Sequence, residues 1–371
     1  MKKTDEHSSL GKSMTMLSHL LLTPKENDEA SLWMRSGLTS QLRNIQRKEF
    51  DEVVDRANSN HVIVRALEVF LGLMLEANDD VRAQWARTAL SFERARISTA
   101  LTFLEQICTA LKDQMCEVAV IKSLDHWPDL GSDLDLYTTA ESKKIVEVMK
   151  QCFSARVAPQ SWGDRLACKW NFLIPGLSEA VEIHMGRLGQ TGEQVAIASC
   201  LTKRSRRVLI DNHTFEVPSV SDRIMISALQ RMYRHFYFRL CDIVDTTELA
   251  DAGAIDYQEL HALATDSGIW EGVATYLVIV SDYVASYRGE GIGMPEWVTA
   301  AARFGGADVY YAREFLRVPI MPQSIKLYSS QLAGLWQRRE LHNCARLSLL
   351  PWLATAAAIG QKVTGSDKGI W

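Results

Sequence analysis

The stretch Gly131-Ser132-Asp133-Leu134-Asp135-Leu136-Tyr137 carries two acids separated by one residue within an alternating run. Side chains of a strand alternate between its faces, so both aspartates point to one face and both leucines to a core on the other. Neighbouring carboxylates repel each other unless a cation lies between them, and oxygen ligands suit Mg²⁺ or Mn²⁺. The stretch therefore predicts a strand that carries a divalent-metal site. The alternative is an exposed strand end with two solvated acids.

The segments on either side extend this pattern. Glu117-Val118-Ala119-Val120-Ile121 has the apolar composition of a buried strand and leads directly into Lys122-Ser123. Glu179-Ala180-Val181-Glu182-Ile183-His184-Met185 alternates again, so Glu182 and His184 share one face. We expect Glu182 to join the two aspartates at the metal and His184 to support it as a hydrogen-bond donor. The alternatives are an exposed strand acid and a structural histidine.

Together these segments resemble the DNA polymerase beta-like nucleotidyltransferase superfamily, in which small residues at a strand end precede Asp-x-Asp and a third acid lies on a neighbouring strand. The Lys122-Ser123 turn, the Glu-x-His motif and the helical tail are similar to the uncharacterised bacterial nucleotidyltransferases of the NTP-transferase-5 type. That tail contains Arg231, Arg234, His235, Arg239, Asp242 and Asp245. The resemblance covers roughly residues 95–290, about one domain length. It departs at Ser123, where that family usually has glycine.

The resemblance implies an enzyme that moves a nucleoside monophosphate from a nucleoside triphosphate, with ATP as the expected donor, to a hydroxyl or phosphate of an acceptor and releases pyrophosphate. It implies two Mg²⁺ or Mn²⁺ ions, with Asp133, Asp135 and Glu182 as metal ligands and catalytic residues. It also implies a set of residues that contact the nucleotide: Lys122, Ser123, Gly131, Ser132, His184, Arg231 and His235. Lys122 and Ser123 would hold the triphosphate, and the arginine-rich tail would face it. An internal ion pair between Arg239 and Asp242 is the alternative for part of that tail.

The acceptor and the partners are constrained by charge. The net charge of −4 gives no general attraction to nucleic acid or to an anionic membrane, so a small-molecule acceptor is favoured. The single dense basic run, Thr202-Lys203-Arg204-Ser205-Arg206-Arg207, would suit RNA phosphates, although such runs are usually solvated loops. Two other readings stay open: a toxin-like enzyme that acts on tRNA or protein, and a catalytically inactive nucleotide-binding protein. The oligomeric state is not determined by the sequence.

The pattern of elements predicts the α+β class. We expect an N-terminal helical region at 1–110, a nucleotidyltransferase α+β domain around a small mixed sheet at 111–219, and a C-terminal helical domain at 220–371. Within the middle region the expected strands are 117–122, 133–138, 168–174 and 180–185, the expected helix is 140–153, and the expected hairpin joins 207–210 to 214–217.

Local signals refine these regions. Asn78-Asp79-Asp80 predicts a turn and a helix N-cap, and Ser221 predicts another N-cap. Residues 1–30 are expected to be polar and loose, and 347–360 to form a buried terminal helix. Seven cysteines without a Cys-x-x-Cys pair argue against a disulfide framework and a zinc site. With no secretory or membrane-spanning segment in the sequence, we expect a cytoplasmic protein.

Overall fold

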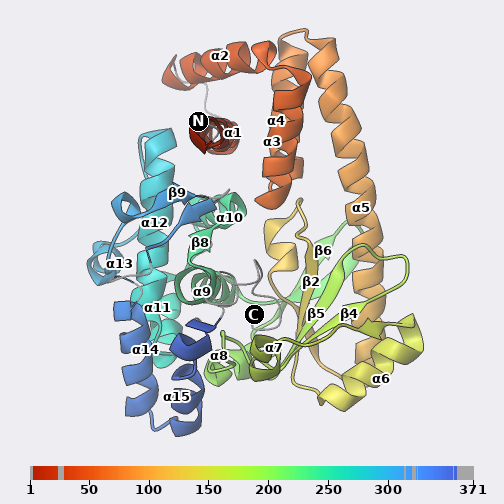
Figure 1. Cartoon of the computed structure of the whole chain (residues 1–371), viewed down its shortest axis with the longest axis vertical. Coiled ribbons are helices and arrows are strands. Elements are labelled where there is room, and N and C mark those ends of the chain that lie inside the picture. The colour runs from red at the N-terminus through yellow and green to blue at the C-terminus, as the bar shows by residue number, and fades with distance from the viewer. Residues whose placement is uncertain are drawn as a thin grey trace.

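The computed structural model describes residues 3–23, 29–312, 315–319, 323, 325–353 and 355–356. It confirms the α+β class: a small mixed sheet is flanked by helices from both ends of the chain (Figure 1). The N-terminal helices end at residue 113 and the first strand begins at 118. The hairpin ends at residue 217 and the C-terminal helices begin at 220. Within the described residues, no helix is both long and apolar enough to cross a lipid bilayer.

Five helices precede the sheet: α1 (Lys3–Leu22), α2 (Glu29–Asn44), α3 (Arg47–Ser59), α4 (Ile63–Glu76) and α5 (Asp80–Asp113). The expectation of a loose, polar start is wrong for the described residues. Met14, Leu17 and Leu20 recur at three-residue steps and are almost fully buried. This apolar stripe anchors α1, so the polar residues around it lie on a packed helix.

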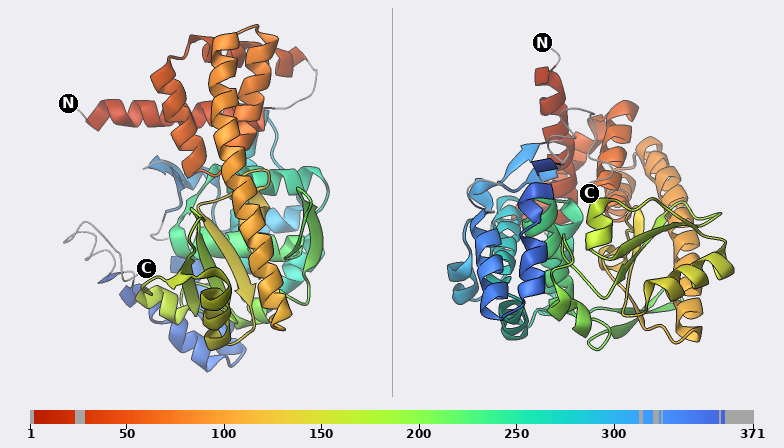
Figure 2. Two further views of the ribbon diagram at one scale, coloured as in Figure 1. Left: turned by 90° about the vertical axis from the view of Figure 1, so that its right-hand side faces the viewer. Right: turned by 60° about the horizontal axis from the view of Figure 1, so that its bottom comes forward.

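The longest helix, α5, runs from the N-terminal helices down along the sheet (Figure 2). The N-cap predicted near Asp79 is confirmed, because the Asp79 side chain accepts a hydrogen bond from the Arg82 N–H. Buried side chains recur at three- and four-residue steps along α5, among them Ile97, Leu101 and Leu104. They form the stripe that packs beneath the sheet.

The sheet has five strands in the order β1-β2-β5-β4-β3. Their bounds are β1 (Val118–Val120), β2 (Asp133–Thr138), β3 (Arg156–Val157), β4 (Lys169–Leu173) and β5 (Ala180–Met185), so the four expected strands are confirmed and β3 is additional. β2 and β5 are parallel neighbours, and Asp135 pairs with Glu182 in their register. Leu134 and Leu136 are fully buried on the opposite face. The alternation read from the sequence thus separates an acidic face from the core.

The remaining elements of the middle region include α6 (Ser142–Phe153) and the hairpin β6 (Arg206–Ile210) and β7 (His213–Val217), which confirm the expected helix and hairpin. The sequence did not predict the short elements η1 (Ser123–His126), α7 (Trp162–Leu166) and α8 (Val195–Cys200). Each is six residues or shorter, which is too short for an amphipathic period to show.

After the hairpin the chain is helical again, with one small three-stranded sheet of order β8-β10-β9 that the sequence did not predict. The elements are α9 (Val220–Gln230), η2 (Arg231–His235), β8 (Tyr237–Phe238), α10 (Leu240–Asp251), α11 (Tyr257–Asp266), α12 (Trp270–Arg288), α13 (Glu296–Ala301), η3 (Gly306–Asp308), β9 (Tyr310–Ala312), β10 (Phe315–Arg317), α14 (Ile325–Gln337) and α15 (Leu341–Leu347).

Two local expectations in this region are wrong. The N-cap of α9 is Ser219, whose hydroxyl accepts from the Asp222 N–H, and Ser221 lies within the helix. The helix expected at 347–360 is not buried where it is described: Leu349 and Trp352 are 43% and 76% exposed. Because α15 ends at the buried Leu347, the residues that follow leave the packed layer. Residues 357–371 lie outside the described part of the chain.

Candidate functional site

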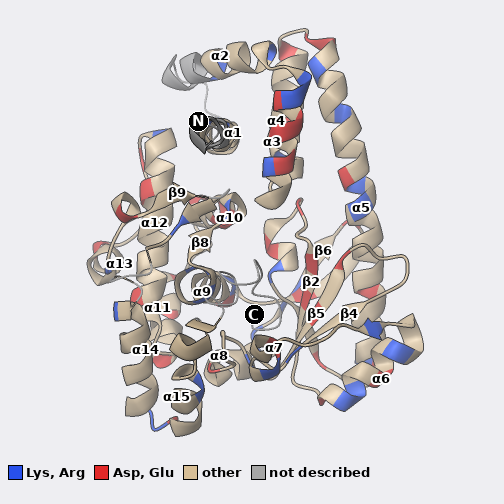
Figure 3. Cartoon of the chain, viewed as in Figure 1, with Lys and Arg blue, Asp and Glu red and all other residues tan. Residues whose placement is uncertain are grey.

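A pocket of about 270 Å³ lies between β2 and β5 on one side and the segment that joins α9 to α10 on the other. Its lining includes nine of the predicted site residues: Lys122, Ser123, Gly131, Ser132, Asp133, Asp135, Glu182, Arg231 and His235. The tenth, His184, lies directly behind the lining and contacts Glu182. Residues from the middle and the C-terminal regions therefore meet at one pocket, whose strand side is rich in acids (Figure 3).

The strand wall places the three predicted acids on one face of the sheet, and ligand atoms of Asp135, Glu182 and His184 lie within 4.8 Å of one another. Asp135 lies beside Glu182 in the parallel register, and Asp133 lies two residues earlier on the same face. The Lys122 ammonium is 2.5 Å from Asp135 Oδ1 and 3.4 Å from Glu182 Oε1. His184 Nε2 is 2.8 Å from Glu182 Oε1, as expected for a donor behind the acid. These side chains form one charged cluster over β2 and β5, which are interior strands of the sheet.

Lys169 completes the strand wall, and the sequence analysis did not identify it. Its ammonium is 2.9 Å from Glu182 Oε2 and 2.8 Å from Asp164 Oδ1. β4 runs antiparallel to β5 with Lys169 opposite His184, which places the lysine beside the acid. A buried lysine in a predicted strand is itself a signal, since lysine is rarely buried without a charge partner.

The three acids differ in how their charge is compensated. Burial alone would raise the pKa of Glu182, but Lys122, His184 and Lys169 outweigh burial and hold this pKa well below its usual range. Asp133 shows the opposite behaviour. Although much of it is exposed, partial burial in the pocket and then repulsion from Asp135 and Glu182 raise the pKa of Asp133 to about 6. Among the described residues, Asp133 is the one of these three acids that makes no ion pair.

The turn before the acids has a strained backbone. Lys122 has φ 61° and ψ −58°, and the Ser123 N–H donates to the Ile121 carbonyl at 2.6 Å, which makes a γ-turn of the rare form. The Ser123 hydroxyl accepts from the Asp135 N–H at 2.7 Å and donates to the Asp133 carbonyl at 3.2 Å. Both the N–H and the hydroxyl of Ser123, the residue expected to hold the triphosphate, thus have partners in the protein, and Ser123 fixes the turn to β2.

A close approach of the His61 side chain favours glycine at position 131. A Cβ at this position would lie 3.0 Å from His61 Cε1, closer than a side chain normally tolerates. The carbonyls of Leu130 and Gly131 accept from the Arg96 guanidinium of α5, at 2.9 and 3.4 Å. The loop before β2 is therefore held from two sides, by His61 and by α5.

The opposite wall differs from the continuous helix that a helical tail would suggest, because its arginines do not share one helix. α9 ends at Gln230, a π-helical turn covers Arg231–His235, and Phe236 then takes a left-handed conformation with φ 53° and ψ 38°. Arg239 is the N-cap residue of α10. The chain changes direction at the π-helical turn and again at Phe236. Arg231, Arg234 and Arg239 therefore extend from a curved segment and not from one straight helix.

Two tail residues use their charge within the protein. Arg231 Nε lies 2.7 Å from Asp242 Oδ2, without a well-aligned hydrogen bond, and this pair is buried. Asp242 also accepts the backbone N–H of Arg239 at 2.7 Å. The ion pair that the sequence suggested for Arg239 is thus made by Arg231, and Arg239 contributes its backbone.

Two arginines on this wall have no acidic partner among the described residues. The Arg239 guanidinium has its nearest polar contact at His61 Nδ1, 3.4 Å away, and Arg234 has no hydrogen bond or ion pair there. Burial and then the positive charges of Arg234 and Arg231 hold the pKa of His235 well below its usual value. This wall is thus a cationic surface facing the pocket, and an anion would complete it.

A buried polar network supports the pocket from below. His126 Nδ1 pairs with Asp245, whose Oδ1 accepts from Arg65 at 2.7 Å, and Arg65 also binds Asp129 at 2.8 Å. His61, His126 and Cys241 bring three donor atoms within 4.8 Å of one another. The Arg239 guanidinium beside His61 disfavours a metal cation there. None of these contacts was predicted, because they join residues that are far apart in the chain.

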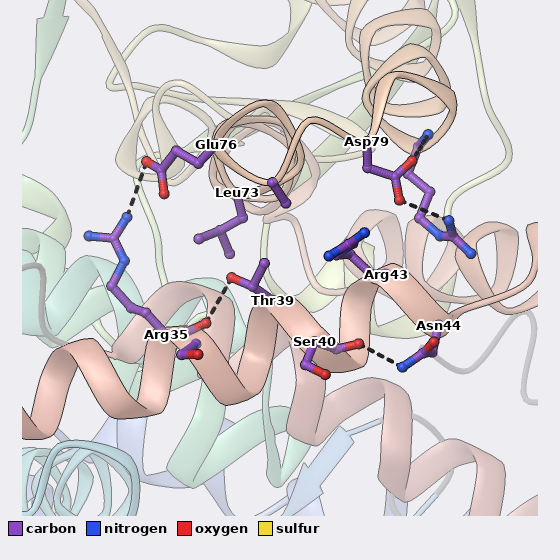
Figure 4. A pocket seen from close by; sticks show the side chains of 11 residues that line it. Arg35, Thr39, Ser40, Arg43, Asn44, Leu73, Glu76 and Asp79 are labelled. Atoms are coloured by element: carbon purple, nitrogen blue, oxygen red, sulfur yellow. Dashed lines mark hydrogen bonds and ion pairs between the residues drawn. The ribbon is translucent and has the colours of Figure 1, made fainter.

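Arginines also cluster in two other places, the basic run at 202–207 and a second pocket among the N-terminal helices. In the basic run, Arg204 pairs with Asp222 and Arg207 with Glu216, and none of residues 202–207 lines the pocket. A larger pocket of about 790 Å³ lies between α2, α4 and α5 (Figure 4). Two of its three arginines already bind acids: Arg35 binds Glu76 at 3.6 Å, and Arg82 binds Asp79 at 2.9 Å. The smaller pocket is therefore the better candidate, because both kinds of charge converge on it.

No protein-family model matches this chain, and no curated protein matches it.

Proposed function

We propose that this protein is a divalent-metal-dependent nucleotidyltransferase that moves a nucleoside monophosphate from a nucleoside triphosphate to a small-molecule hydroxyl or phosphate. One observation carries the proposal. Carboxylates from two neighbouring parallel strands face two arginines that have no acidic partner among the described residues, across one pocket. A bound metal ion and a polyphosphate would satisfy both walls at once.

The donor set fits a hard divalent cation. Asp133 offers a carboxylate with no ion pair among the described residues, and Asp135 offers its Oδ2. Oxygen ligands on a rigid strand suit Mg²⁺ or Mn²⁺. When bound, such an ion would neutralise charge on the triphosphate and help to orient the acceptor oxygen.

The helix wall would bind the triphosphate. Arg234 and Arg239 offer planar groups that match phosphate oxygens in pairs, and no acid competes for them among the described residues. His235, whose lowered pKa keeps it neutral, and Tyr237 extend this wall with aromatic rings whose centroids are 5.5 Å apart. Since both arginines come from a turn that is packed into the fold, their positions are largely fixed before the nucleotide arrives.

The acceptor is proposed to enter beside Asp133, the exposed end of the acidic wall. Glu182 is poorly suited to take a proton from it, because both of its oxygens bind cations or His184. The basic run at 202–207 does not line the pocket and two of its arginines are paired, which favours a small acceptor over RNA.

The test is transfer of label from α-³²P-labelled triphosphates to fractions of a cell extract in the presence of Mg²⁺. Wild-type protein should label a small-molecule fraction, and the Asp133→Asn/Asp135→Asn variant should not. Glu141→Gln, an exposed acid at the start of α6, is the matched control and should behave as wild type. Labelling of an RNA or protein fraction instead would contradict the proposed acceptor.

A second reading, a nucleotide-binding protein without catalysis, is favoured by the Lys122 ammonium on the acids. It predicts that triphosphates raise the melting temperature of the wild type while no fraction takes up label. The Arg234→Gln/Arg239→Gln variant should then lose the thermal shift.

A further inference from the structure

The Lys122 ammonium lies where an ion shared by Asp135 and Glu182 would have to lie. Its nitrogen is 2.5 Å from Asp135 Oδ1 and 3.4 Å from Glu182 Oε1. A magnesium ion bound by both carboxylates would need oxygens at about 2.1 Å in this same space. The ammonium and a bridging ion therefore exclude each other.

The backbone holds this lysine in place. Its γ-turn is closed by the 2.6 Å hydrogen bond from the Ser123 N–H to the Ile121 carbonyl. The Ser123 hydroxyl then ties the turn to β2 through the backbone of Asp133 and Asp135. Strained turns that the surrounding structure enforces are typical of functional sites. β2 thus positions both aspartates and, through Ser123, the turn that carries the Lys122 ammonium.

The remaining oxygens divide the acids into two groups. Glu182 Oε1 binds His184, and Oε2 binds Lys169, which Asp164 holds at 2.8 Å. Asp135 Oδ2 has no hydrogen bond or ion pair with a described residue. The Asp133 carboxylate has only a long hydrogen bond from the Ser132 hydroxyl, at 3.4 Å, among the described residues. The oxygens left for a metal therefore lie at the Asp133 end of the wall.

We propose that Lys122 takes the place of one of the two divalent ions usual for nucleotidyl transfer, so that the protein with its nucleotide holds a single divalent ion on Asp133 and Asp135. This inference rests on the proposed function. It assigns Lys122 as a resident cation for Asp135 and Glu182, in place of the triphosphate contact that the sequence suggested. Glu182 then positions Lys122 and does not ligate the metal.

The test counts bound Mn²⁺ ions per chain by electron paramagnetic resonance. Full-length protein and α,β-methylene ATP are present at equal concentrations, both far above the dissociation constant of their complex. The wild type should hold one ion per chain. Lys122→Met keeps the length of the side chain and removes its charge, so the space between Asp135 and Glu182 opens and the count should rise to two. The matched control Lys169→Met removes a cation from the outer oxygen of Glu182 and should leave the count at one.

Two ions in the wild type, or one ion in Lys122→Met, would overturn the inference and leave the proposed function standing. No ion in the wild type would overturn both. Circular dichroism melting establishes that each variant is folded. If Lys122→Met does not fold, the wild-type count still decides, and Lys122→Arg, which keeps the positive charge, should hold one ion.

Discussion

The two walls of the pocket carry opposite charge and compensate it differently. On the strand wall, Glu182 is held by two lysines and a histidine, and of the three acids only Asp133 makes no ion pair with a described residue. On the helix wall, Arg231 is buried against Asp242, while Arg234 and Arg239 have no acidic partner among the described residues. Each wall therefore contains a paired, structural part and an unpaired part that faces the other wall. We therefore propose that ligands bind at the charges that the fold leaves unpaired.

The largest effect should come from the unpaired end of the strand wall. Asp133→Asn/Asp135→Asn removes the negative charge of both carboxylates and replaces one oxygen of each by an amide nitrogen, so label transfer should fall by about four orders of magnitude, which corresponds to about 5 kcal/mol of transition-state stabilisation. Initial rates of transfer measure it, with Glu141→Gln as the control. A rate within tenfold of the wild type would remove these acids from the catalytic site.

The paired arginine should matter for stability. Asp242→Asn leaves the buried Arg231 without its counter-charge, and we expect a loss of about 3–5 kcal/mol in the free energy of unfolding. Arg234→Gln, on the same wall, should change it by less than about 0.5 kcal/mol, since no ion pair is lost. Urea denaturation compares the two variants. Equal losses would abolish the distinction between paired and unpaired arginines.

The unpaired arginines should matter for the nucleotide. Each charge-assisted contact contributes about 1.5 kcal/mol, so Arg234→Gln/Arg239→Gln should weaken triphosphate binding by about 100-fold. Titration of a fluorescent triphosphate analogue measures the dissociation constant. Arg207→Gln, an exposed arginine outside the pocket, should leave it unchanged. Unchanged binding in the double variant would place the triphosphate elsewhere.

The smallest effect concerns the network beneath both walls. Burial alone would lower the pKa of His126, but the Cys241 sulfur and the Asp245 carboxylate outweigh burial and raise this pKa well above its usual value. A raised folded-state pKa gives stability that is complete below the unfolded value of about 6.5 and is lost as the pH rises through the folded value. His126 thus contributes a decline of at most about 1.4 kcal/mol per pH unit. Subtracting the urea-derived profile of His126→Gln from that of the wild type isolates this contribution, and a flat difference above pH 6.5 would contradict it.

The strand wall could be predicted from sequence because its geometry is local. Alternation places Asp133 and Asp135 on one face, and the parallel neighbour that carries Glu182 shows the same alternation. The place of Ser123 beside these acids was also predicted, but its hydrogen bonds to the backbone of Asp133 and Asp135 were not. Lys169 was missed because its place beside Glu182 depends on the register between β4 and β5.

The helix wall could be predicted only in composition. The cluster of arginines was visible, but the π-helical turn and the left-handed Phe236 that aim them were not. The pairing of Arg231 with Asp242 follows from that turn. His61 and His126 approach the pocket through contacts with residues more than a hundred positions away, which no local pattern reports.

The grip of Arg96 on the carbonyls of Leu130 and Gly131 has a mechanical consequence. Arg96 lies near the middle of α5, a rod roughly 50 Å long at 1.5 Å per residue. The half of α5 that follows Arg96 packs against the sheet through Ile97, Leu101 and Leu104, so the helix cannot pivot freely about Arg96. A displacement of the N-terminal helices that shifts α5 would therefore also move the loop that leads into Asp133 and Asp135.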